Sequence, residues 1–217
     1  MTIHLCFHGI GTIESEREPG EAHYWVAQDM FHRILDLLPG RADVELSFDD
    51  GNRSDADIAL PALLERGLDA TFFALAGRLD DPLSLSRDDL HRLRGAGMRI
   101  GSHGWGHVPW RGLGDADARR ELIEARAVLE EAIGAKITQA ALPLGRYDRR
   151  LLRRLKEARY RTVFTSDRFP ARDTAWLRPR YSVTSDDTVE SVAAILDGRA
   201  GLGGVAGFGK SLIKRLR

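Results

Sequence analysis

The segment from residue 44 to residue 51 constrains the fold of this chain more than any other. Its side chains alternate between apolar and polar and then reach two carboxylates and a glycine: Val44, Glu45, Leu46, Ser47, Phe48, Asp49, Asp50 and Gly51. This alternation indicates a β-strand with one apolar and one polar face. Strands of an open α/β sheet are usually apolar on both faces, so the polar face favours a barrel, whose mouth at the carboxyl ends of the strands holds the active site.

The turn after this strand brings two negative charges together. Gly51 can adopt a positive φ and turn the chain, so Asp50 need not point away from Asp49. Two carboxylates this close repel each other unless a cation or a raised pKa offsets the repulsion. Asp-Asp-Gly-Asn is also ordinary turn sequence, so a second motif is needed to decide between a site and a simple turn.

A pair of histidines supplies that second motif. A short strand ends near Ser102, and His103 and His107 follow it, separated by glycines and Trp105. A helical turn or a tight loop would let both imidazoles face one point. Two histidines and one carboxylate form a ligand set that leaves metal positions open for water and substrate.

These two motifs together resemble the polysaccharide deacetylase superfamily, also called the NodB-homology or carbohydrate esterase family 4 fold. The resemblance implies an α/β protein with a distorted, incomplete (β/α) barrel. It implies that Asp49 is the general base and that Asp50, His103 and His107 bind a divalent metal. The metal is expected to be Zn²⁺, with Co²⁺, Ni²⁺ or Fe²⁺ as alternatives.

The chain departs from the family pattern at two places. The segment 142–145 resembles the third motif of the family, but Ala141 stands where an arginine is usual and Leu144 where an aromatic residue is usual. Arg146 or Arg180 could replace that arginine in space. The C-terminal histidine that serves as general acid is missing, since no histidine follows His107. We therefore hypothesise that His8, at the end of the first strand, is the general acid.

Three residues are candidates for contact with the substrate. Trp105 and Trp110 flank His107, and an exposed tryptophan there would stack on a sugar, although both could instead pack over the barrel rim. We expect Trp105 to bind the substrate, together with Leu144 and Tyr147 of the third motif.

The remaining patterns predict one domain over residues 1–197 and a glycine-rich, basic tail over 198–217. We expect strands near 2–8, 44–48, 70–75, 98–102, 137–142, 161–165 and 180–184, and helices near 23–38, 54–64, 86–94, 115–133, 148–158 and 186–197. In the long helix, the charges, Glu121 among them, are interpreted mainly as a solvated face. The tail is expected to fray, with contact to an anionic membrane surface as the alternative.

Composition limits the partners and the compartment. The net charge is +0, which gives no indication of a nucleic-acid partner. The N-terminus shows no leader pattern, no apolar run could span a membrane, and the one cysteine, Cys6, reads as a core residue. We therefore expect a cytoplasmic protein.

The expected activity is metal-dependent hydrolysis that removes the acetyl group from an N-acetylated sugar. A cytoplasmic site favours a small-molecule or lipid-linked acetylamino sugar as substrate. One alternative is hydrolysis of another non-peptide C–N bond, as in imidases. The other is a catalytically inactive carbohydrate-binding relative.

Overall fold

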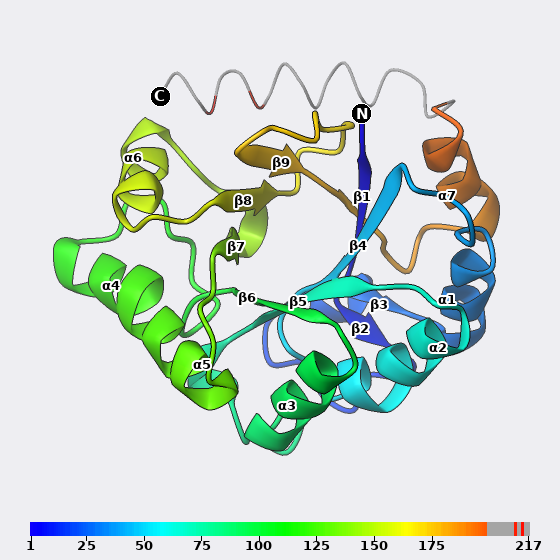
Figure 1. Cartoon of the computed structure of the whole chain (residues 1–217), viewed down its shortest axis with the longest axis horizontal. Helices are drawn as coiled ribbons and strands as arrows, with labels where there is room; N and C mark the ends of the chain where they lie inside the picture. The colour runs from blue at the N-terminus through cyan, green and yellow to red at the C-terminus, as the bar shows by residue number, and fades with distance from the viewer. Residues whose placement is uncertain (199–210, 212–213, 215–217) are drawn as a thin grey trace.

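The chain forms a ring of parallel strands in a computed structural model that describes residues 1–198, 211 and 214. The eight-stranded sheet has the order β10-β1-β4-β5-β6-β7-β8-β9, and each neighbouring pair is parallel. The strands are β1 (Ile3–Phe7), β4 (Val44–Phe48), β5 (Ala70–Ala74), β6 (Arg99–Ser102), β7 (Gln139–Ala141), β8 (Thr162–Thr165), β9 (Leu177–Pro179) and β10 (Tyr181–Ser182). The predicted α/β class and the distorted (β/α) barrel are confirmed (Figure 1).

One short segment closes the ring. β9 pairs with β8, and β10 pairs with β1 at the opposite edge of the sheet. Only Arg180 separates the two strands. Residues 177–182 therefore bridge the two edges of the sheet. In place of the single strand predicted over 180–184, the chain forms two short strands, β9 and β10, with a bend at Arg180.

Helices cover the outside of the ring (Figure 1). They are α1 (Gln28–Leu35), α2 (Leu60–Glu65), α3 (Arg87–Gly95), α4 (Asp115–Arg119), α5 (Ala125–Ile133), α6 (Arg149–Glu157) and α7 (Val189–Leu196). Phe31 of α1 packs edge-on against Phe7 and Phe48, and Phe48 stacks on Phe72 at 4.7 Å between ring centroids. The apolar face of β4 thus packs against the helices, which leaves Ser47 and Asp49 on the inner side.

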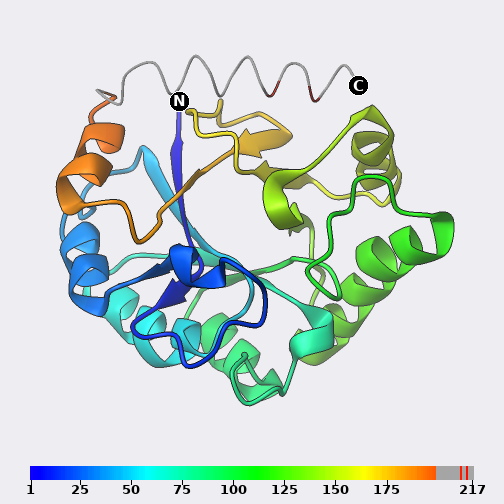
Figure 2. The ribbon, with the colours of Figure 1, turned by 180° about the vertical axis from the view of Figure 1, so that it is seen from behind.

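The prediction of a helix over 23–38 is wrong for its first residues. A short 3₁₀ turn, η1 (Glu21–Tyr24), is followed by strand β3 (Trp25–Val26), which pairs with β2 (Gly9–Ile10), and α1 begins only at Gln28. The indole of Trp25 lies on Gly9, where an added Cβ would come within 2.1 Å of the ring. This close packing explains the strand. Figure 2 shows residues 9–26, in dark blue, across one end of the ring.

Two further predicted helices contain a wider turn. The helix over 54–64 consists of a π-type turn, η2 (Asp55–Ala59), and α2. Pro61 lies in the first turn of α2, where its missing N–H is not needed. The helix over 115–133 runs through α4, the π-type turn η4 (Arg120–Glu124) and α5.

Helices in the described part of the chain are all too short or too polar to cross a membrane. Most of the predicted tail, 198–217, lies outside the described residues, so its fraying and membrane contact stay predictions. Ser211 and Lys214 are described, and they contact the barrel: Tyr147 Oη lies 2.8 Å from Ser211 Oγ, and Lys214 Nζ donates to Asp167 at 2.7 Å.

Asp55 of η2 is a fully buried acid. Its side chain is 0% exposed, and neither carboxylate oxygen has a hydrogen-bond partner among the described residues. Burial, with the charges of Asp50 and Asp49 adding to it, raises the pKa of Asp55 well above its usual range. The folded protein therefore holds the Asp55 proton more tightly than the unfolded chain does.

We predict that Asp55→Asn becomes more stabilising as the pH rises. The folded state keeps the Asp55 proton above the unfolded pKa of about 4, so wild-type stability falls with pH by up to about 1.4 kcal/mol per pH unit until the folded pKa is passed. The asparagine does not titrate and escapes this loss. Urea unfolding in chelator at pH 5 and pH 8 measures the difference, with the exposed Asp57→Asn as control. A stability difference that does not change with pH would contradict protonation of Asp55.

Candidate active site

The Asp49-Asp50 pair lies at the carboxyl end of β4, as the sequence predicted. Asp50 and Gly51 both have a positive φ, 73° and 63°. A Cβ added to Gly51 would lie 3.4 Å from the Cα of Ala74, so the turn packs against the end of β5. The backbone reversal at Asp50 directs the two carboxylates into one pocket rather than to opposite sides of a strand.

The two histidines lie in a tight loop at the carboxyl end of β6. Gly104 has a φ of 91°, and His107 has a φ of 56°. Glu121 holds this loop: its carboxylate accepts hydrogen bonds from the backbone N–H of Trp105 at 2.7 Å and of Gly106 at 3.2 Å. Glu121 also accepts from the indole N–H of the buried Trp110 at 3.1 Å. Glu121 is 4% exposed, so its interpretation as part of a solvated helix face is wrong.

Asp50, His103 and His107 form a group that could hold a metal ion. Asp50 Oδ1 lies 3.4 Å from His103 Nε2 and 3.3 Å from His107 Nε2, and it is buried without a hydrogen-bond partner among the described residues. Two ligands each about 2.1 Å from a tetrahedral ion are about 3.4 Å apart. The three ligand atoms therefore fit a divalent cation such as zinc.

The Nδ1 atom of each histidine already has a hydrogen-bond partner. His103 Nδ1 lies 3.0 Å from the carbonyl oxygen of Ala141, and His107 Nδ1 lies 2.7 Å from Glu18 Oε2. Since both partners can only accept, each Nδ1 must carry the hydrogen, which leaves Nε2 free to bind a metal. Glu18 also pairs with Arg78. Glu18 lies in a loop, and the sequence of that loop does not indicate that Glu18 contacts His107.

Arg180, one of the two arginines that could replace the third-motif arginine in space, pairs with Asp49. Its guanidinium donates to both oxygens of Asp49, at 2.7 and 2.6 Å, and to Ser47 Oγ at 2.9 Å. Both side chains are almost fully buried. Of the two arginines considered, Arg180 pairs with Asp49, whereas Arg146 lies exposed on the pocket rim.

Neighbouring charges shift the pKa values of Asp49 and His103 in opposite directions. Burial alone would raise the pKa of Asp49, but the charges of Arg180 and His103 keep it below its usual value. Burial opposes protonation of His103, yet Asp49 and Asp50 together raise its pKa. The site thus favours a positive charge beside Asp50, which either a proton or a metal ion can supply.

A pocket of about 300 Å³ opens over these groups. His8 lies in its wall, 4.8 Å from the ring of Tyr24, and a ring nitrogen of His8 lies within 4.8 Å of a carboxylate oxygen of Asp49. Burial lowers the pKa of His8, so it is neutral at rest. Cys6 Sγ also lies within this distance, so Cys6, His8 and Asp49 form a second group that could hold a metal ion, although both oxygens of Asp49 already accept from Arg180.

The three expected substrate contacts lie in different places. Leu144 is 52% exposed and lines the pocket. Trp105 is outside the pocket lining and is half-buried against the core, with the guanidinium of Arg120 4.7 Å above its ring. Tyr147 is also outside the lining, and its buried hydroxyl donates to Asp167 at 2.6 Å.

We predict that Arg180→Met strongly destabilises the protein, because Asp49 would stay buried with an unpaired charge. Breaking a buried pair typically costs about 3–5 kcal/mol, and Asp49→Asn in the same chain should recover part of it. The control is Arg119→Met, since Arg119 pairs at 3.0 Å with Glu124 on the exposed surface and such pairs contribute about 0–1 kcal/mol. Denaturant unfolding in chelator measures all variants. Equal losses for the two arginine variants would refute the importance of the buried pair.

Comparisons with known proteins find a relative in sequence and several solved structures of similar fold. The Bacillus subtilis protein YxkH is 23% identical over 177 residues, which cover 75% of this chain and 63% of that relative. The chain thus spans less than two thirds of the relative's length. The Streptococcus pyogenes deacetylase PplD, solved in complex with acetate, has a similar fold, with a TM-score of 0.79, 18% identity and coverage of 90% of this chain and 97% of that one. IcaB from Ammonifex degensii follows with a TM-score of 0.71, 22% identity and coverage of 92% and 97%.

The family comparison covers both motifs. Residues 39–163, which include the Asp49-Asp50 turn and both histidines, match the family described as polysaccharide deacetylase. The fold, the two strand-end motifs and this match agree, and the chain belongs to the polysaccharide deacetylase family.

Proposed function

We propose that this protein is a metal-dependent hydrolase that removes the acetyl group from an N-acetylated sugar. The observation that carries the proposal is the pairing of two sites in one pocket. A carboxylate held ionised by Arg180 lies beside an Asp-His-His set that fits a divalent cation. A base without metal ligands, or ligands without a base, would support binding alone.

Asp50, His103 and His107 would hold the metal, with Zn²⁺ as the first candidate and Co²⁺, Ni²⁺ or Fe²⁺ as the others. When bound, the ion lowers the pKa of water towards neutrality and polarises the carbonyl of the acetyl group. Glu18 and the Ala141 carbonyl fix both imidazole rings, so the ligand atoms are oriented in advance.

Asp49 is the general base in this proposal. It accepts the proton of the water that attacks the amide carbonyl carbon, and Arg180 keeps it ionised and fixed in orientation. The C–N bond then breaks, acetate forms, and the amine leaves with the proton. An amine is a poor leaving group without this proton, so a group near Asp49 must deliver it.

His8 is our candidate for that delivery. It lines the pocket within 4.8 Å of Asp49 and is neutral at rest. It could therefore take the proton from Asp49 and pass it to the amine. The missing third-motif arginine was one of two reasons for regarding the chain as an inactive relative. The pairing of Arg180 with Asp49 weakens that reason, because a guanidinium from another part of the chain contacts the proposed base.

The proposed substrate is a small-molecule or lipid-linked acetylamino sugar, and the proposed compartment is the cytoplasm. A pocket of about 300 Å³ lies at the lower end of the usual range for ligand pockets. It therefore suits a single sugar unit at the reacting position.

We predict that the purified protein carries about one divalent metal ion and releases acetate from acetylamino sugars, and that chelator abolishes the release. Asp49→Asn keeps a side-chain oxygen that can accept from Arg180, and thermal unfolding checks that the variant folds. It should keep the metal and lose activity by at least about 100-fold, because a positioned base contributes about 10²–10⁴-fold. The measurements are elemental analysis and an acetate assay on a panel of sugars, with the exposed Asp69→Asn as control.

The outcomes separate the alternatives. Bound metal without acetate release from any sugar would favour hydrolysis of another C–N bond, tested with cyclic imides, or a binding role. Absence of metal from protein with intact Asp50, His103 and His107 would refute the central argument.

We predict that His8→Ala lowers kcat by about 10²–10⁴-fold while the metal content stays unchanged. His8 is not one of the three proposed ligands, so metal loss is not expected. His23→Ala, at a half-exposed histidine that pairs with Asp186, is the control. Unchanged turnover in His8→Ala with metal bound would show that another group protonates the amine.

A further inference from the structure

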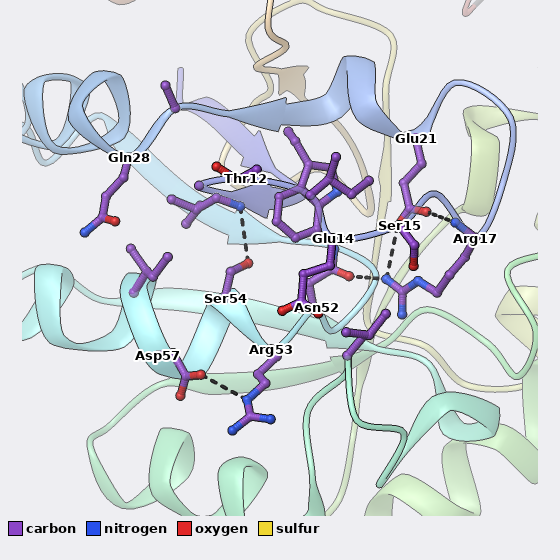
Figure 3. A pocket seen from close by; sticks show the side chains of 17 residues that line it. Thr12, Glu14, Ser15, Arg17, Glu21, Gln28, Asn52, Arg53, Ser54 and Asp57 are labelled. Carbon is purple, nitrogen blue, oxygen red and sulfur yellow. Dashed lines mark hydrogen bonds and ion pairs between the residues drawn. The ribbon is translucent and has the colours of Figure 1, made fainter.

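The loop of residues 11–20 connects β2 to η1 and forms one wall of the catalytic pocket. Glu18, Pro19 and Gly20 of this loop line that pocket. None of the residues from 11 to 20 is buried. On its other side, a cavity of about 620 Å³ lies between the loop and residues 52–58 (Figure 3). Close packing of apolar side chains therefore does not hold the loop in place.

Hydrogen bonds between backbone groups contribute little to the position of the loop. At its start, the N–H of Gly11 donates to the carbonyl of Val26 at 2.8 Å. After Gly11, the backbone-to-backbone bonds of the loop within the described chain run only to η1, whose N–H groups donate to the carbonyls of Glu18 and Gly20. Segments with few buried apolar groups and few such bonds open easily by local unfolding. The position of this loop must depend on its polar side chains.

Arg17 attaches the loop to the turn that carries Asp50. Its guanidinium donates to Asn52 Oδ1, two residues after Asp50 in the chain, and to Ser84 Oγ at 2.8 Å. Glu21 pairs with the same guanidinium at 3.1 Å, and Figure 3 shows Arg17 with both Glu21 and Asn52. Asn52 is 0% exposed. The contact therefore reaches the buried part of the turn after β4.

Glu18 attaches the loop to the segment that carries His107. Its carboxylate accepts from His107 Nδ1 at 2.7 Å and also pairs with Arg78. Arg17 and Glu18 are neighbours in the chain, yet they contact the two different segments that carry proposed metal ligands. One short loop thus connects the turn after β4 to the histidine loop after β6.

We propose that the 11–20 loop holds Asp50 and His107 in place for a metal ion, with Arg17 and Glu18 as positioning residues. The inference rests on the proposed function, because it assumes the metal site. When His107 Nε2 binds an ion, Nδ1 must carry the hydrogen and can only donate, which favours the contact with Glu18. Metal binding therefore stabilises the attached loop, and by linkage the attached loop strengthens metal binding.

The test is the Kd for Zn²⁺, measured by competition with a chelator of known affinity. Glu18→Ala should raise this Kd by about 10–100-fold, the usual cost of removing the outer partner of a metal-binding histidine. Arg17→Met should raise it by at least about 10-fold, although the hydrogen bonds of the Arg17 guanidinium in the described structure go to Glu21, Asn52 and Ser84 and not to the proposed ligands. Loss of a nearby positive charge would by itself strengthen cation binding, so the expected effect has the opposite sign.

The control is Arg53→Met, which should leave the Kd unchanged or lower it. Arg53 lines the same cavity as Arg17 but pairs with the exposed Asp57 at 3.1 Å (Figure 3). A loop that has lost one attachment gains nothing from the other, so Arg17→Met combined with Glu18→Ala should bind zinc as Glu18→Ala alone does. Glu18→Gln keeps an oxygen that can accept from His107 and should recover part of the affinity. Thermal unfolding in chelator checks that each variant folds.

Hydrogen exchange of the loop backbone gives a second readout. Zinc should slow exchange over residues 12–20 in the wild-type protein and not in Glu18→Ala. An unchanged Kd in Arg17→Met, additive losses in the double variant, or exchange that ignores zinc would overturn the inference. Wild-type protein that binds no zinc would refute the proposed metal site and this inference together. Zinc binding without acetate release would refute only the proposed activity.

Discussion

The buried pair of Arg180 and Asp49 connects the closure of the barrel to the chemistry of its pocket. Arg180 is the single residue between β9 and β10, which bind opposite edges of the sheet. Its backbone N–H donates to Thr165 of β8 at 2.8 Å, while its guanidinium reaches Asp49 and Ser47 at the end of β4. The side chain that neutralises Asp49 is thus fixed by the same residues that close the ring. A charge pair this deeply buried tolerates little displacement, because either partner alone would be left unsolvated.

The rest of the site follows from the charge that remains. Arg180 compensates Asp49, so Asp50 is the carboxylate left without a fixed cation, and its Oδ1 has no hydrogen-bond partner among the described residues. Two histidines face it with Nε2, because Glu18 and the Ala141 carbonyl occupy their Nδ1 atoms. In the proposed mechanism, this difference would allow Asp49 to act as base while Asp50 binds a metal, although the two are adjacent in the chain.

Local sequence predicted the strand-end motifs but not the residues that support them. The positions of Asp49, Asp50 and the histidines follow from strand periodicity and glycine turns, which are short-range properties. Arg180 meets Asp49 across 131 residues, and Glu18 meets His107 across 89. No periodic pattern encodes such contacts. Glu121 was misjudged because its helix is rich in exposed charges, and the helix predicted over 23–38 failed where packing of Trp25 on Gly9 overrides helical spacing.

The location of Arg180 bears on how a missing motif residue should be interpreted. Ala141 alone argues for lost function, since the family arginine is absent from its usual strand. Yet the role of that arginine is geometric: two donors on a buried carboxylate. Any strand that reaches the same point can supply them, and the bent strand 177–182 does so. An unused Asp49 would leave a buried ion pair that well-packed apolar residues could replace at little or no cost in stability. The presence of this pair beside three residues that could hold a metal ion therefore supports the proposed catalytic role of Asp49.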